Sequence, residues 1–174
     1  MRLRLRKVCD FMQSRLLDGI WNLVIGENFK VQKSGFNPKT AEDFTGCEYT
    51  SIKGTVPGNF ELDMVKAGLL EDPYYSTNVL KTQELENRHL WYFRKFDCDF
   101  EDTERCYLKF DGIDTVSEIY LNGELIGKTS NMFVAHEFEA RNLKCKDNEL
   151  VVHIMPVSIY SRDFEIAPSC SALP

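Results

Sequence analysis

Hydrophobic and polar positions alternate through the middle of the chain. Leu108 and Phe110 share one face of an extended segment, because side chains two residues apart point to the same side of a strand. Asn122-Gly123 then separates two short apolar runs, and this dipeptide tolerates the positive φ values of a type I′ turn. The pattern predicts a tight antiparallel hairpin formed by residues 118–121 and 124–126.

Similar runs recur along the chain between turn residues. They predict further strands at residues 16–23, 90–100, 105–110, 133–138 and 149–154. With the hairpin, we expect at least seven strands, at spacings of roughly 8–14 residues, as in antiparallel sandwiches and jelly rolls. The predicted fold is therefore mostly β, an antiparallel β-sandwich of the jelly-roll type, with Trp21 as a core side chain of the first strand.

One segment has helical periodicity. Phe60, Met64 and Ala67 fall on one stripe at positions i, i+4 and i+7, the spacing of an amphipathic helix. Asn59 suits the N-cap, and Gly68 suits the left-handed position that ends a helix. We expect one short helix of about ten residues within 52–70.

Two segments show neither the alternation of a strand nor the spacing of an amphipathic helix. Residues 26–45 are polar and contain glycine and proline, which predicts a loop or a loosely paired hairpin. Residues 71–87 are expected to be irregular, and they include a turn proline, two aromatic rings and several hydrogen-bonding side chains. Sugar recognition needs this mixture, because flat rings cover C–H groups while polar tips bind hydroxyls. The candidate sugar-binding residues are Tyr74, Tyr75 and Asn78, with Trp91 as a further aromatic; a purely structural loop is the alternative.

Length and charge narrow the function classes. The 174 residues suit one domain, and 43% hydrophobic with 28% charged residues is an ordinary globular composition. Residues 1–17 hold five basic residues against Asp10, a balance of +4, which leaves −10 on residues 18–174 from the net −6. An acidic body repels phosphates, so we expect no nucleic-acid partner. Residues 1–15 are predicted to be a basic leader or a short strand.

The sequence contains no recognisable targeting, metal-binding or cofactor-binding signal. Asp10, Gln13 and Arg15 interrupt every apolar run near the N-terminus, so neither a secretory signal nor a membrane span is expected. The six cysteines form no C-x-x-C pair, which predicts no metal site and reduced thiols in a cytoplasmic protein. Cys98 shares strand parity with Phe96 and is expected to be buried. We find no phosphate loop or dinucleotide fingerprint and expect no cofactor.

Two blocks of motifs carry a family resemblance. The first block includes Val-Pro-Gly at residues 56–58, Ala-Gly-Leu at 67–69 and Asp-Pro-Tyr-Tyr at 72–75, followed by Asn78 and Trp91-Tyr92. The second block is Phe-Asp-Gly-Ile-Asp-Thr, Ile-Tyr-Leu-Asn-Gly, Ile-Gly and Asn-Met-Phe within residues 108–133. In this order they resemble the N-terminal sugar-binding, galactose-binding-like domain of family 2 glycoside hydrolases, in the form of the β-mannosidase branch.

The resemblance implies an activity located outside this chain. In the resembled enzymes two glutamates on a (β/α)₈ barrel hydrolyse a terminal β-linked sugar with retention, and such a barrel takes about 250 residues. The chain is therefore expected to be a non-catalytic domain that supports the barrel and shapes its sugar pocket. A role at that pocket, carried over from related β-galactosidases, falls on Asn78. Carboxylate pairs such as Asp97/Asp99 and Glu137/Glu139 are expected on solvated strand faces, with no catalytic residue.

Several alternatives remain open from sequence. Residues 155–174 lack the Gly-Trp-Asp-like motif of the resembled family, so we expect residues 16–174 to be a sandwich truncated at its C-terminus. An open sheet edge would then favour self-association. A stand-alone carbohydrate-binding module is the second functional hypothesis, and it requires an exposed aromatic platform. Trp91 and Tyr92 are adjacent on one strand, so one of them is expected to face inward.

Overall fold

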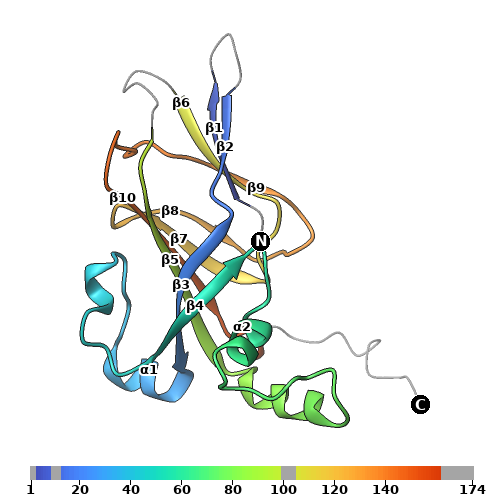
Figure 1. Cartoon of the computed structure of the whole chain (residues 1–174). Helices are drawn as coiled ribbons and strands as arrows, with labels where there is room; N and C mark the ends of the chain where they lie inside the picture. The colour runs from blue at the N-terminus through green and yellow to red at the C-terminus, as the bar shows by residue number, and fades with distance from the viewer. Residues whose placement is uncertain (1–2, 9–12, 99–104, 162–174) are drawn as a thin grey trace, which may run out of the picture.

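The computed structural model describes residues 3–8, 13–98 and 105–161, and it contains two antiparallel sheets (Figure 1). The larger sheet has the strand order β4-β3-β5-β10-β7-β8, and the smaller has the order β2-β1-β6-β9. The predicted β-sandwich is thereby confirmed. The strands are β1 Leu3–Val8, β2 Gln13–Leu16, β3 Gly19–Glu27, β4 Thr50–Val56, β5 Arg88–Phe96, β6 Arg105–Phe110, β7 Val116–Leu121, β8 Glu124–Thr129, β9 His136–Glu139 and β10 Asn148–Met155.

The hairpin of β7 and β8 has the predicted turn. Asn122 and Gly123 have φ values of 50° and 85°, as a type I′ turn requires. The side chain of Asn122 also fastens the turn to β10, because its oxygen accepts a hydrogen bond from the Glu149 backbone N–H at 2.8 Å. A β-bulge between Ile119 and Tyr120 shifts the register of the pair.

The main core lies between the two sheets. Trp21 is 1% exposed, which confirms its predicted place in the core, and its indole N–H donates to the Leu17 carbonyl at 2.9 Å. Cys98 is buried in the same cluster, as its strand parity predicted. Phe110 and Phe138 meet edge to face at 6.1 Å inside this core. Burial of these aromatic and aliphatic side chains is the main stabilising term of the sandwich.

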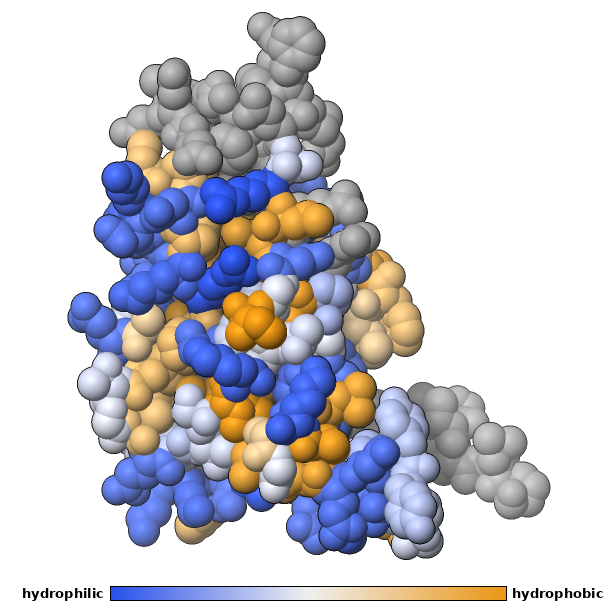
Figure 2. Space-filling view, viewed as in Figure 1, coloured by the Kyte–Doolittle hydropathy of each residue, from blue (hydrophilic) through white to orange (hydrophobic). Residues whose placement is uncertain are grey.

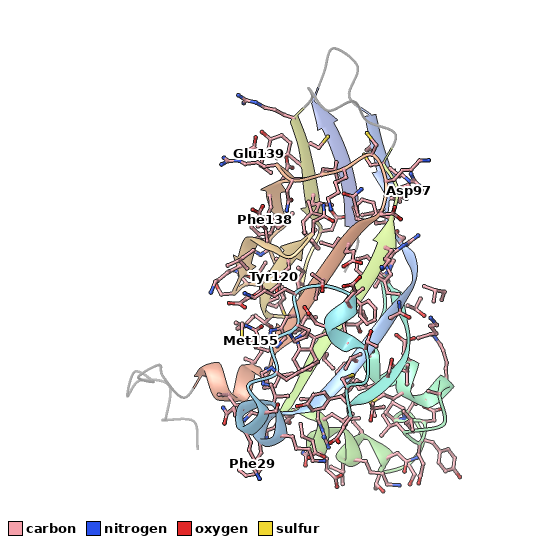
Figure 3. The ribbon with its side chains drawn as sticks, turned by 90° about the vertical axis from the view of Figure 1, so that its left-hand side faces the viewer. Phe29, Asp97, Tyr120, Phe138, Glu139 and Met155 are labelled. Carbon is pink, nitrogen blue, oxygen red and sulfur yellow. The ribbon has the colours of Figure 1, made fainter. Side chains whose placement is uncertain are left out.

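A second hydrophobic cluster lies on the outer face of the six-stranded sheet. Its buried members are Val24, Val31, Phe44, Trp91, Tyr120 and Val151. The helix α1, Asn28–Ser34, and the 3₁₀ helix η1, Glu42–Phe44, supply two of them and cover this face (Figures 1 and 3). The sequence prediction of a loop or loose hairpin over residues 26–45 is therefore wrong. Because both faces of the sheet are covered, Trp91 and Tyr92 are both buried.

The predicted helix is present and shorter than expected. α2 spans Phe60–Lys66, and the Asn59 side chain accepts hydrogen bonds from the backbone N–H groups of Glu61 and Leu62. Gly68 has a φ of 72°, and the Leu69 N–H reaches back to the Met64 carbonyl at 2.9 Å. This is the Schellman ending that the glycine favours.

Further helical segments were not predicted. They are α1, η1, the 3₁₀ helix η2 at Asn78–Leu85 and the short helix α3 at Val157–Tyr160. Several strands also start or end at other residues than predicted; for example, β3 ends at Glu27, β5 ends at Phe96, and β9 starts at His136. Residues 99–104, which contain the predicted turn and Asp99, lie outside the described residues. In the described part of the chain, no helix has the length and apolar character needed to cross a membrane.

The N-terminal segment forms strands. β1 pairs along its whole length with β6 and also pairs with β2. Of the two alternatives predicted for residues 1–15, a basic leader or a short strand, residues 3–8 form the strand. β1 is an inner strand of the smaller sheet.

Candidate functional site

The predicted sugar-binding loop is organised by Asp72. One side-chain oxygen of Asp72 accepts the Tyr74 backbone N–H at 2.9 Å, and its carbonyl accepts the Tyr75 N–H at 3.1 Å. The Asn78 side-chain amide donates to that same carbonyl at 3.1 Å. An Asp that bonds backbone groups two residues on is a standard turn builder. Asn78, the first residue of η2, therefore helps to fix the loop.

The same turn leaves both tyrosines in solvent. Tyr74 is 83% exposed and Tyr75 is 73% exposed. Ser76 follows with a φ of 54°, in the left-handed region. Leu69, Val79 and Leu80 are also 49–58% exposed. The loop thus presents rings and aliphatic side chains outward on a hydrogen-bonded frame.

An ion pair joins the two ends of this loop. Lys81 Nζ lies 2.8 Å from the Glu71 carboxylate. Hydrogen bonding and charge attraction from Lys81, with a smaller contribution from Asn78, lower the pKa of Glu71. Both side chains are at least half exposed, so the pair contributes little to global stability. Its role is local, since it holds η2 close to the start of the loop.

Trp91 lies apart from the loop residues and is fully buried. The prediction that Trp91 could offer an exposed ring is wrong, because α1 and η1 cover the sheet face on which it lies. Its ring stacks on His153 at 4.7 Å and on His89 at 5.5 Å, each at an interplanar angle of 15°. His89 Nδ1 is 2.8 Å from His153 Nε2.

Burial sets the protonation of this histidine pair. Desolvation lowers the pKa of His89 to about 4. Desolvation, followed by repulsion from His89, lowers the pKa of His153 to about 3. Asn28 Oδ1 lies 3.0 Å from His89 Nε2, and both rings are neutral near pH 7. The sequence analysis missed this cluster, although His89 and Trp91 share strand parity; nothing local showed that His153 pairs with the same strand.

A second missed feature is a cavity of about 160 Å³ beside α2. Phe60 and Tyr92 line it, with the carboxylates of Glu61 and Asp114. Glu61 Oε2 is buried without a hydrogen-bond partner among the described residues. Burial, with a smaller contribution from Asp114, raises the pKa of Glu61. The cavity could hold one small polar group against an apolar floor.

In each of the two carboxylate pairs, at least one member has a structural partner. Asp97 accepts the Asp147 backbone N–H at 3.0 Å, and Glu139 pairs with Arg141 at 2.7 Å. Across the residues that the structure describes, no group of three His, Cys, Asp or Glu side chains is placed to hold a metal ion.

Comparison with known proteins agrees with the fold. Residues 31–169 match the family described as glycosyl hydrolase 2 galactose-binding domain-like. A β-mannosidase from Rattus norvegicus is 31% identical over 134 residues, which are 72% of this chain and 15% of that protein. Beta-mannosidase B from Thermothelomyces thermophilus is 35% identical over 98 residues, 55% of this chain and 12% of that protein.

Solved structures of glycoside-cleaving enzymes share this fold. A β-D-mannosidase from Dictyoglomus thermophilum superposes with a TM-score of 0.66 at 32% identity, over 86% of this chain and 17% of that chain. An exo-chitosanase from Amycolatopsis orientalis shares the fold, with a TM-score of 0.59 at 17% identity, over 79% of this chain and 16% of that one.

The chain thus spans about one sixth of the length of the relatives that it matches. The family match extends from α1 to beyond β10 and includes the Tyr74–Asn78 loop and the β7–β8 hairpin. The resemblance drawn from the two motif blocks is confirmed: the chain belongs to the glycosyl hydrolase 2 galactose-binding domain-like family, with β-mannosidases among its relatives.

Proposed function

We propose that this chain is the non-catalytic N-terminal domain of a β-mannosidase-like exo-glycosidase. Catalysis on a terminal β-linked sugar, with retention, belongs to a barrel domain that this chain does not contain. The domain supports that barrel and narrows its sugar pocket. An exo-glucosaminidase or β-galactosidase is the nearest alternative parent enzyme, and the compartment proposed from the cysteine pattern is the cytoplasm.

The observation that carries the proposal is the outward-facing loop of residues 69–80. Exposed rings and aliphatic side chains on a fixed frame favour burial against another protein surface. Asp72 holds the frame through backbone and side-chain bonds, so the loop can dock with little ordering cost. In this arrangement Tyr74 and Tyr75 lie at the rim of the pocket, and Asn78 lies behind them.

A stand-alone carbohydrate-binding module remains the second candidate. Tyr74 and Tyr75 are exposed enough to form an aromatic platform. Trp91 cannot contribute, because it is fully buried. A module of this kind would bind sugar through the tyrosines without any barrel.

The test compares this chain with a longer one that carries its natural C-terminal continuation. Hydrolysis of chromogenic β-mannoside, β-galactoside and β-glucosaminide is measured for both. Activity in the longer chain alone supports the proposal and identifies the sugar. Turnover by the 174-residue chain would overturn it, because the carboxylates assigned to structure would then be catalytic.

The role of Asn78 is tested in the longer chain. Loss of one hydrogen bond to the sugar predicts that Asn78→Ala lowers kcat/KM about tenfold. Asn37→Ala, at an exposed asparagine outside the loop, is the matched control. Unchanged kcat/KM in Asn78→Ala, together with a lowered Tm, would restrict Asn78 to its structural bond with Asp72.

A further inference from the structure

A cavity of about 720 Å³ opens between α1, the segment after η1 and the adjoining ends of β3 and β4. Figure 3 looks toward the side of the molecule where α1, with Phe29 at its outer end, and the segment containing η1 lie across the six-stranded sheet. None of the lining residues comes from residues 69–85, the candidate loop and η2. The volume lies in the range of small-molecule sites, about 300–1,000 Å³.

One wall of this cavity is aromatic and rigid. Phe36 and Tyr49 both line it, with ring centroids 4.8 Å apart. Behind them lies buried Trp91, whose ring centroid is 5.3 Å from Phe36 and 6.2 Å from Tyr49. The Tyr49 hydroxyl is also fixed by a 2.9 Å hydrogen bond with Ser34 Oγ. These contacts hold both half-buried rings in place before any ligand arrives.

Part of the charge around the cavity is already neutralised. Glu27 lies 2.8 Å from Arg88 and 3.1 Å from Lys30, and hydrogen bonds from these two cations lower the pKa of Glu27. Asp43 accepts two backbone N–H groups of its own turn. These groups form a fixed polar rim.

Other polar side chains at the cavity are available to a ligand. Within the described part of the chain, neither Lys33 nor Glu48 makes a hydrogen bond or ion pair, and Thr45 lies between η1 and Glu48 with its hydroxyl unengaged. The lining therefore offers an ammonium donor, a carboxylate acceptor and a hydroxyl beside an aromatic wall. Three basic and three acidic residues line it (Lys30, Lys33 and Arg88; Glu27, Asp43 and Glu48). This balance gives no preference for an anion or a cation.

We propose that this cavity is a sugar-binding site of the domain itself, separate from the Tyr74–Asn78 loop. A neutral pyranose has an apolar C–H face for the rings of Phe36 and Tyr49, and ring hydroxyls for Lys33, Glu48 and Thr45. Its ligand is a neutral mono- or disaccharide, bound with a Kd of about 1 mM, as suits a shallow polar site. The site goes beyond the proposed pocket-shaping role and does not require a barrel.

The test is titration of the 174-residue chain with methyl β-mannoside and with mannobiose, followed through backbone amide shifts by NMR. Saturable shifts at residues 33–36 and 45–49 are expected. Lys33→Ala and Glu48→Gln change exposed side chains, and each is expected to weaken binding about tenfold through the loss of a charged hydrogen bond. Glu124→Gln, at an exposed position of β8 outside the cavity, is the matched control and leaves this affinity unchanged.

Three results would overturn the site. These are no saturable shift with either sugar, saturable shifts confined to residues 72–78, or wild-type affinity in both cavity variants. The outcome is independent of the proposed function, because catalytic activity of the longer chain is measured separately. A chain that binds sugar here and a longer chain that is inactive would support this site and reject the proposed enzyme.

Discussion

Burial determines the chemistry of the two stacked histidines on the outer sheet face. The two imidazole rings contact each other, His153 stacks on Trp91, and His89 also contacts Asn28. The charged neighbour Glu118 favours protonation of His153. Desolvation outweighs that carboxylate, so both pKa values fall below the ordinary 6.5. The folded chain therefore binds fewer protons than the unfolded chain in acid.

The first prediction concerns stability against pH. The pKa values of His89 and His153 are lower in the folded chain than in the unfolded chain. The contribution of this neutral pair to the free energy of unfolding is therefore fully present above pH 6.5 and is lost as the pH falls from 6.5 toward 4. His153→Phe keeps a ring stacked on Trp91 and removes one titrating group, so it is expected to flatten this loss by about 1–3 kcal/mol. Urea unfolding of both proteins at pH 7 and pH 4.5 measures this difference in unfolding free energy.

The matched control is Phe93→Leu, at a ring on the same strand as Trp91 that stacks on Phe44 and carries no titrating group. It is expected to lower stability equally at the two pH values. If His153→Phe loses as much stability in acid as the original chain does, the neutral pair is not responsible.

At the element scale, α2 is tied to β4 by one buried carboxylate. Asp63 is 2% exposed, and its two oxygens accept the Thr55 backbone N–H at 2.8 Å and the Thr55 hydroxyl at 3.0 Å. Lys66 Nζ lies 3.0 Å from the same carboxylate. The charge is therefore compensated although Asp63 is buried.

Replacing this carboxylate is the second prediction. Asp63→Ala leaves the Thr55 N–H buried without an acceptor and is expected to cost about 2–3 kcal/mol of unfolding free energy. Asp63→Asn keeps one acceptor and should cost less. Urea denaturation measures both, beside Glu84→Ala at an exposed position of η2 as the control. Equal effects of Asp63→Ala and Glu84→Ala would show that α2 is held mainly by its apolar contacts.

The third prediction concerns the contact between the sheets. A Cβ at Gly127 on β8 would overlap the ring of Phe138 on β9, one of the side chains labelled in Figure 3. Gly127→Ala is therefore expected to destabilise the chain by about 1–3 kcal/mol through overpacking. Adding Phe138→Leu should relieve part of that cost, and a double-mutant cycle measures the coupling. Additive effects would contradict the overlap.

The sequence predicted correctly those elements that depend on residues close together in the chain. The Asn122-Gly123 turn, the Asn59 cap and β6 at Arg105–Phe110 lie where sequence placed them. α1 was missed because it has no apolar stripe: Val31 is its buried residue, and Phe29 is 75% exposed. Its stability comes from the sheet that it covers, and no local pattern reports that contact.

The sequence indicated which residues belong to the candidate loop but not how they are arranged in space. Tyr74 and Tyr75 were identified with Asn78, and the structure places all three on one turn held by Asp72. Trp91 was misplaced because its burial depends on α1 and η1, which are distant in sequence from β5. The Phe36–Tyr49 wall was missed for the same reason, since both rings lie in or beside segments predicted as loop.

At the scale of the whole molecule, each sheet formed by the described residues ends in two outer strands. β4 and β8 are the outer strands of the larger sheet, and β2 and β9 those of the smaller sheet. Outer strands leave backbone N–H and C=O groups without strand partners, which favours pairing with another copy. The apolar side chains of the 69–80 loop offer a second route to association.

The last prediction separates these two routes by sedimentation velocity over a range of concentrations. Leu125 on β8 is 47% exposed, and Leu69 at the start of the loop is 49% exposed. If the chain associates through the sheet edge, Leu125→Lys is expected to shift it toward monomer, because a charged side chain opposes edge pairing, while Leu69→Lys leaves association unchanged. The reverse pattern would assign association to the loop, the surface that we propose covers the barrel. A monomer at every concentration would reject edge pairing, and the apolar loop would then be expected to bury its side chains only in the longer enzyme.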